Sequence, residues 1–164
     1  MKLTATIMTF AAAASAVLAP ADRQAIDRAV AAYYRPYTIG RASAAVWERP
    51  IFARDIAALV AHWRRVMPAD DLDGLNDGDW LCLCQDWDHS KFRVTTLERR
   101  ALGPDAAEVR LRIDLGIGQT REARLLLRRE ARIWRIENLF SQDFPQGLQQ
   151  ALRETIAEDE KLPK

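Results

Sequence analysis

The sequence has few of the residues on which enzyme chemistry most often depends. Its 164 residues include two histidines and two cysteines, and no stretch matches a nucleophile elbow, a zincin helix, a glycine-rich phosphate loop or a zinc-finger spacing. The formal net charge of +1 lacks the basic excess of a dedicated nucleic-acid-binding domain. We therefore expect no nucleic-acid partner, no cofactor and no metal.

The two cysteines, Cys82 and Cys84, are separated by a single residue in an apolar run. On an extended strand their side chains point the same way with Cα atoms more than about 6 Å apart, whereas a disulfide needs Cβ atoms about 3.5–4.5 Å apart. We therefore expect two reduced, partly buried thiols, with a disulfide as the alternative if the segment bends. A metal site of both cysteines and His89 would lack a fourth ligand.

The N-terminus has one early charge, Lys2, followed by an uncharged apolar stretch over residues 3–18. Small residues at 14–16 and at 19–21 each fit the A-x-A pattern that precedes a signal-peptidase cut. The sequence thus predicts a signal peptide over residues 1–21, cut after Ala16 or Ala21, and a periplasmic or secreted protein. The stretch is short for a membrane span, and an uncleaved anchor is the alternative; no span is expected once the leader is removed.

Two stretches after the leader have helical spacing. Pro36 is expected to end or kink the first helix, which starts near Asp22, and Pro68 to stop the second. The apolar stripe of the first consists of Ile26, Val30, Tyr33 and Tyr37, and that of the second of Ile56, Leu59, Val60, Trp63 and Val66.

The second half of the chain alternates apolar and charged residues. The alternation is strict over residues 108–115, and weaker repeats over 92–100, 123–128 and 134–136 predict four antiparallel strands joined by short turns. A last helix is expected over residues 146–158. Residues 22–160 are therefore predicted to form one α+β domain, with N-terminal helices packed in a curved antiparallel sheet and a C-terminal helix.

The outward face of this sheet collects five arginines and four acids. Interleaved charges are typical of a solvated sheet face, and a surface for an anionic ligand is the alternative. The arginines are Arg110, Arg112, Arg124, Arg128 and Arg135, and the acids are Glu108, Asp114, Glu122 and Glu137.

Three stretches resemble a bacterial family of exported proteins, the domain of unknown function 3828. They are DWLCLCQDWD (79–88), AAYYRPY (31–37) and LLLRREARIWRIENLF (125–140). Trp80 stands where proline is expected from the family. The resemblance implies a nuclear-transport-factor-2-like (cystatin-like) cone, in which a curved sheet wraps helices and a cavity can open at the mouth, and it implies no established activity.

A non-catalytic binding or protein-interaction module is the function that these observations favour, with a small molecule or a protein as partner. An inhibitor or immunity protein for a neighbouring toxin is a specific version, and a homodimer is compatible with the sequence. Such a pocket is expected to be apolar. Its candidate lining consists of Tyr33, Tyr34, Trp63, Trp80 and Trp134.

A small enzyme is the alternative, with Asp79, Asp86 or His89 as acid or base in the cone cavity. A structural motif is expected in the same segment, consisting of Asp79, Cys82, Cys84, Gln85 and Asp86. Within it, Gln85 and Asp86 are predicted to accept hydrogen bonds from buried N–H groups of the adjoining loop.

Overall fold

The computed structural model describes residues 18–40, 44–67 and 75–161. Most of the predicted leader (residues 1–17) lies outside the described residues, and so do residues 68–74, which include the first half of the acidic stretch DDLDGLNDGD (70–79). The elements in chain order are α1 (Pro20–Thr38), the short 3₁₀ turn η1 (Val46–Glu48), α2 (Arg54–Val66), β1 (Arg93–Gly103), β2 (Ala106–Asp114), β3 (Thr120–Glu130), β4 (Ile133–Phe140) and α3 (Leu148–Asp159).

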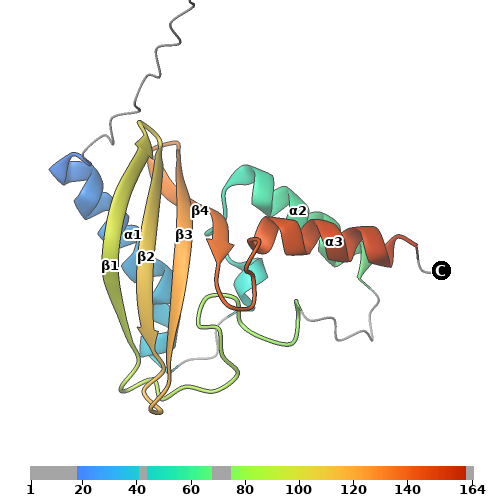
Figure 1. Cartoon of the computed structure of the whole chain (residues 1–164), viewed down its shortest axis with the longest axis horizontal. Coiled ribbons are helices and arrows are strands. Elements are labelled where there is room, and N and C mark those ends of the chain that lie inside the picture. Colours follow the sequence, from blue (N-terminus) through green and yellow to red (C-terminus); the bar gives the residue numbers. More distant parts are fainter. Residues whose placement is uncertain (1–17, 41–43, 68–74, 162–164) are drawn as a thin grey trace, which may run out of the picture.

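The four strands form one antiparallel meander in the order β1-β2-β3-β4, and with the three helices they give the predicted α+β class. Helix α1 crosses one face of the sheet, and α2 and α3 lie side by side beyond β4 (Figure 1). The alternation over residues 108–115 is confirmed, because Val109, Leu111, Ile113 and Leu115 are all buried. The helices are thus N-terminal and C-terminal to the sheet, as expected.

Helix α1 is longer than the sequence predicted. Pro20 occupies its first turn, where the missing N–H costs nothing, and the N–H of Arg23 donates to the carbonyl of Ala19 at 3.0 Å. Pro36 lies in the last turn and the helix continues to Thr38. The stripe of Ile26, Val30, Tyr33 and Tyr37 is buried as expected.

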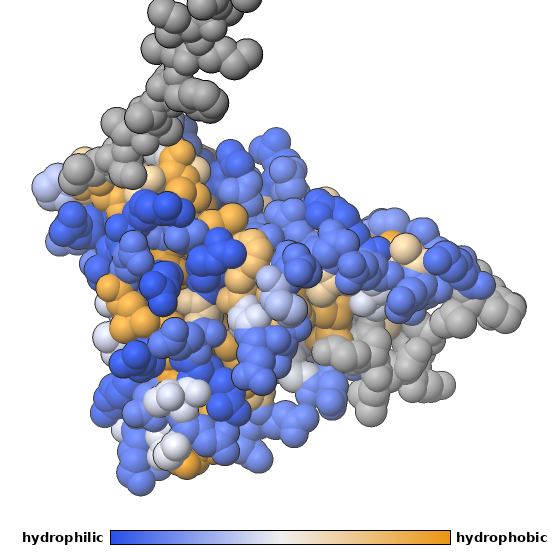
Figure 2. Space-filling model, in the orientation of Figure 1, coloured by the Kyte–Doolittle hydropathy of each residue, from blue (hydrophilic) through white to orange (hydrophobic). Residues whose placement is uncertain are grey.

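The outer face of the sheet is covered by matched charges, and hydrophilic residues predominate over the sheet in Figure 2. Each predicted arginine has a carboxylate within 4.0 Å; Arg112 pairs with Glu122 at 3.2 Å and Arg124 with Glu108 at 3.0 Å, for example. Exposed pairs of this kind stabilise a protein little. The face is therefore a ladder of paired charges, as is typical of a solvated sheet face.

None of the helices in the described parts of the chain combines the length and apolar character that a membrane crossing requires.

Candidate binding groove

The segment after the acidic stretch forms a tight turn organised by one carboxylate. Asp79 Oδ1 accepts hydrogen bonds from the N–H of Leu81 (2.8 Å), the N–H of Cys82 (3.0 Å) and the hydroxyl of Tyr37 (2.6 Å). The N–H of Leu83 donates to the Asp79 carbonyl at 2.9 Å, so the chain reverses within a few residues. An aspartate that caps the backbone N–H groups after it is a recurrent way to fix a turn.

Cys82 and Cys84 form a disulfide across this turn, with Cα atoms 5.2 Å apart. The expectation of two reduced thiols on an extended strand is therefore wrong. The chain does not extend here, because Asp79 gathers the N–H groups of the turn and Leu83 adopts a left-handed conformation, with φ of 56°. The disulfide also removes both thiolates from any metal site, and in the described residues no group of three His, Cys, Asp or Glu is placed to hold a metal ion.

Gln85 and Asp86 are both exposed. Gln85 Nε2 donates to the Asp77 carbonyl at 3.3 Å, and Asp86 makes no side-chain hydrogen bond with the described residues. The role expected of this pair, to accept from buried N–H groups of the loop, is performed by Asp79.

The five aromatic residues predicted to line a pocket are all in the core. Tyr33, Tyr34, Trp63, Trp80 and Trp134 are at most 4 % exposed. Trp63 and Trp80 pack against each other with ring centroids 5.6 Å apart, and the Tyr33 hydroxyl donates to the Trp134 carbonyl at 2.5 Å. The set does not surround one cavity: Trp80 borders the groove described below, and Trp134 borders a separate hollow near the start of α1.

The tyrosines of α1 connect the core to the turn. Burial raises the pKa of Tyr37 far above the usual range of a phenol, and the neighbouring Asp79 carboxylate raises it further. Burial likewise raises the pKa of Tyr33 and of Tyr34. Arg49 lies over the Tyr37 ring, 5.8 Å from its centroid, and its Nη1 donates to the Tyr37 hydroxyl at 3.4 Å. Tyr37 therefore stays protonated and serves Asp79 as a donor.

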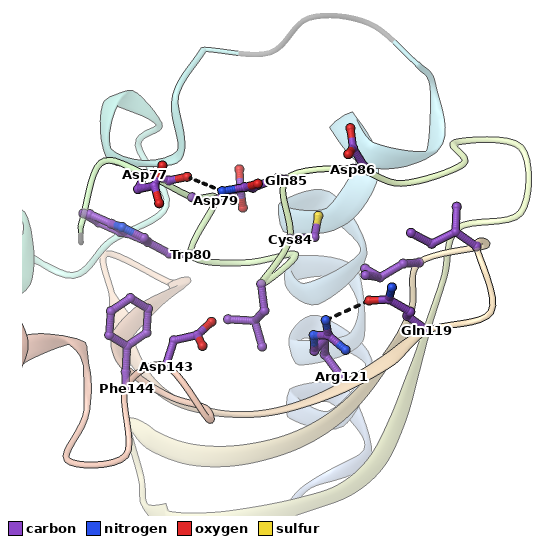
Figure 3. Close-up of a pocket in the computed structure, with 14 residues that line it drawn as sticks. Asp77, Asp79, Trp80, Cys84, Gln85, Asp86, Gln119, Arg121, Asp143 and Phe144 are labelled. Carbon is purple, nitrogen blue, oxygen red and sulfur yellow. Dashed lines mark hydrogen bonds between the residues drawn. The ribbon is translucent and has the colours of Figure 1, made fainter. Parts of the chain in front are cut away.

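A groove of about 480 Å³ lies between the disulfide turn, the β2–β3 connection and the segment after β4 (Figure 3). Its floor is apolar: Trp80, Leu83, Leu115 and Phe144 border it and are each at most 7 % exposed. Ile117, 47 % exposed, stands on its rim.

The rim of the groove carries more negative than positive charge. Its members include the carboxylates of Asp77, Asp86 and Asp143, none of which has an ion-pair partner among the described residues. Arg121 is the one guanidinium among the lining residues, and its Nη2 donates to Gln119 Oε1 at 2.8 Å. Such a surface fits an apolar group that lies next to a cation.

Of the groove's lining residues, the sequence reasoning singled out only those between Asp79 and Asp86 as site candidates; the ones it missed include Gln119, Arg121, Asp143 and Phe144. These four lie far along the chain from the turn, Arg121 at the start of β3 and the others in the connections around the strands, and neither a motif nor a periodic pattern distinguishes them. Only the meander, which returns the β2–β3 connection and the end of β4 to the turn, brings them together (Figure 3).

A neighbouring hollow of about 420 Å³ brings together the three residues of the enzyme alternative. Asp79, Asp86 and His89 line it beside Tyr37 and Trp87, and Trp87 Nε1 donates to the Tyr37 carbonyl at 3.0 Å. The imidazole of His89 lies against Gly40, where a Cβ would come within 2.8 Å of the ring. No described lining residue is a serine, threonine or cysteine, and one Asp79 oxygen already serves three donors.

No family model, no curated protein and no solved structure matches this chain.

Proposed function

We propose that this protein is an exported, non-catalytic interaction module, which binds an extended segment of a partner protein in the groove beside the disulfide turn. The observation that carries this proposal is the combination of an apolar floor with three carboxylates that have no ion-pair partner in the described residues. The occupant is a segment in which an apolar side chain lies next to lysine or arginine.

Charge complementarity supports a basic partner. Residues 68–88 contain seven aspartates and no basic residue. Asp77 and Asp86 of this segment, with Asp143 from the segment after β4, are among the residues that line the groove. Complementary charge of this kind accelerates encounter and selects among partners. Lysine and arginine also carry long apolar stems that can lie on the floor while the charged head reaches the rim.

The leader-like N-terminus and the motifs that resemble domain of unknown function 3828 support an exported member of that family with the nuclear-transport-factor-2-like cone. On this basis the protein acts in the periplasm or outside the cell, and an inhibitor or immunity protein for a basic toxin is the specific version. Fractionation of the native host tests the compartment. An intact Met1 on protein from the cytosol would contradict export.

Binding is tested with a short synthetic peptide in which lysine and leucine alternate, and with a matched peptide of glutamate and leucine. We expect the lysine peptide to bind, with amide chemical-shift changes at residues 77–86, 115–121 and 143–144, and the glutamate peptide not to bind. Asp77→Asn with Asp143→Asn should weaken binding about tenfold, which corresponds to about 1.4 kcal/mol.

The control removes a carboxylate elsewhere: Glu158→Gln, on the exposed face of α3, should leave the affinity unchanged. Equal affinity for both peptides, shift changes confined to other surfaces, or self-association of the chain through the groove would each contradict the proposal.

A second candidate function rests on the shared hollow of Asp79, Asp86 and His89. If His89 acts as a general base there, purified protein should hydrolyse p-nitrophenyl acetate, and His89→Gln should abolish that turnover while the fold and the binding of the lysine peptide persist. Turnover unaffected by His89→Gln removes this candidate.

A further inference from the structure

The disulfide turn forms one wall of the groove. Cys84 is half-buried and borders the groove together with Leu83, whereas Cys82 has no exposed surface. The position of this wall depends on a single bend in the chain. The bend lies between Asp79 and Cys84, which pair with each other in an isolated antiparallel bridge.

The bend contains one residue in an unfavourable conformation. Leu83 has φ of 56°, a left-handed geometry that a side chain with a Cβ rarely adopts and that glycine or asparagine adopts more readily. The Cys82–Cys84 bond spans Leu83 and holds the residues on either side of it with their Cα atoms 5.2 Å apart. An extended chain would place those atoms more than about 6 Å apart, so the bond requires the bend, and together with the Asp79 cap it holds Leu83 in this conformation.

The contribution of this disulfide to global stability is small by comparison. A bond that closes a loop of so few residues removes little entropy from the unfolded chain. The core extends from α1 to α3 and includes Leu81, Cys82 and Leu83 of the turn, so apolar burial as well as the bond holds the turn in place. The main effect of the bond is therefore local: it fixes the shape of the turn.

We propose that the Cys82–Cys84 disulfide is a redox control on the groove: the oxidised protein presents the binding surface, and reduction releases Leu83 and dismantles that wall. This inference rests on the proposed function. The co-reactant is a dithiol reductant of the protein's surroundings, and the same surface returns when the pair is oxidised again.

The reduction proceeds from the accessible side. A thiolate of the dithiol attacks Sγ of Cys84, the S–S bond breaks, and Cys82 leaves as a thiolate that takes up a proton. The second thiolate of the reagent then attacks the mixed disulfide and releases Cys84, which is protonated in turn. The dithiol loses two electrons and becomes a disulfide, and the protein disulfide gains them.

The first measurement follows amide hydrogen exchange in wild-type protein with and without dithiothreitol. The N–H groups of Leu81, Cys82 and Leu83 are bonded to Asp79, and we expect their exchange to accelerate at least tenfold on reduction. Amides of β2 and β3 are the internal control and should keep their protection. Unchanged exchange at the three turn amides overturns the inference, whatever the groove binds.

The second measurement compares the affinity for the lysine–leucine peptide in the two states. Reduction should weaken binding at least tenfold, and oxidation with diamide should restore it. Cys82→Ser with Cys84→Ser should bind as weakly as the reduced protein and should not respond to dithiothreitol; its circular dichroism spectrum verifies the fold, and the wild-type comparison stands if this variant does not fold.

The two proposals fail separately. No peptide binding by the oxidised protein refutes the proposed function, while the exchange experiment still decides whether the turn responds to reduction. Equal peptide affinity of oxidised and reduced protein refutes the redox control and leaves the binding function intact.

Discussion

The sheet and the disulfide turn follow different rules within one chain. In the sheet, position alone decides the environment of a side chain: Leu111 is buried and Arg110, one residue earlier, is exposed on the ladder. In the turn, Leu81, Cys82 and Leu83 are three consecutive buried residues, and their placement depends on one carboxylate and one covalent bond. A repetitive pattern is thus tolerant of single changes on its outer face, whereas the turn concentrates its structure in a few groups.

The largest effect is expected where the two regions meet, at the tyrosines of α1. All three tyrosines of the chain are buried with raised pKa values, whereas in the unfolded chain each ionises near pH 10. The contribution of these tyrosines to the free energy of unfolding is therefore fully present below about pH 10. Above that pH the free energy of unfolding falls by about 1.4 kcal/mol per pH unit for each tyrosine.

Absorbance at 295 nm checks this expectation. Phenolate should form only together with the loss of the circular dichroism signal, while the chain in concentrated guanidinium chloride should titrate near pH 10. Phenolate formation near pH 10 in folded protein would show that the tyrosines are accessible to solvent. It would contradict their burial between α1, the sheet and the turn.

Within the sheet, one residue step should separate a large effect from a small one. Leu111→Ala removes a fully buried side chain from β2 and should cost about 2–5 kcal/mol of unfolding free energy. Arg110→Ala removes exposed ion pairs and should change it by no more than about 0.5 kcal/mol. Urea denaturation gives both values; similar midpoints for the two variants would break the contrast between the faces.

Within the turn, the contrast should lie between two aspartates. Asp79→Ala leaves two N–H groups and the Tyr37 hydroxyl without their acceptor, and we expect a loss of about 2–3 kcal/mol. Asp86→Ala, on the exposed side, should stay within about 0.5 kcal/mol of wild type. Thermal denaturation of the oxidised proteins measures the stability of both variants. Equal losses of stability would show that Asp86 has a structural role as important as that of Asp79.

The smallest effect concerns the β3–β4 hairpin, where two residues other than glycine adopt an unfavourable backbone conformation. The β3–β4 hairpin turns at Ala131 and Arg132, with φ of 47° and 70°, although such two-residue turns favour Asn-Gly. Ala131→Asn with Arg132→Gly should therefore stabilise the protein by about 1 kcal/mol.

The opposite sign is expected at Gly116, which also has positive φ and whose added Cβ would lie 2.8 Å from the Asp88 carbonyl oxygen. Gly116→Ala should destabilise the protein in the same urea assay. A loss of stability in the hairpin variant would show that Ala131 and Arg132 make contacts that outweigh their backbone conformation.

The sequence was sufficient for the architecture because the architecture is periodic. Alternation over residues 108–115 defined a strand and its buried face, and the spacing of Ile26, Val30 and Tyr33 defined a helix, since both patterns arise from backbone geometry alone. Element ends were less accurate: β1 extends to Gly103 and α1 begins at Pro20.

The groove was not predictable in the same way. The run Trp80-Leu81-Cys82-Leu83-Cys84 has the composition of a strand, and nothing local reveals that Asp79 caps it into a turn. The aromatics that suggested a pocket, such as Trp63, instead fill the core, because large rings bury the most apolar surface. Other members of the groove, such as Gln119, Arg121 and Phe144, come from distant parts of the chain, and the meander brings them to the turn.

The buried start of α1 distinguishes between the two cleavage sites predicted for the N-terminal leader. Leu18 is 8 % exposed and belongs to the core, and the Ala19 carbonyl receives the first N–H bond of the helix. A peptidase cut after Ala21 would remove the core residue, the carbonyl acceptor and Pro20 in one step, and would leave the helix to begin on an unpaired turn. A cut after Ala16 would keep all three, so of the two sites that the sequence offers, the folded structure favours the first.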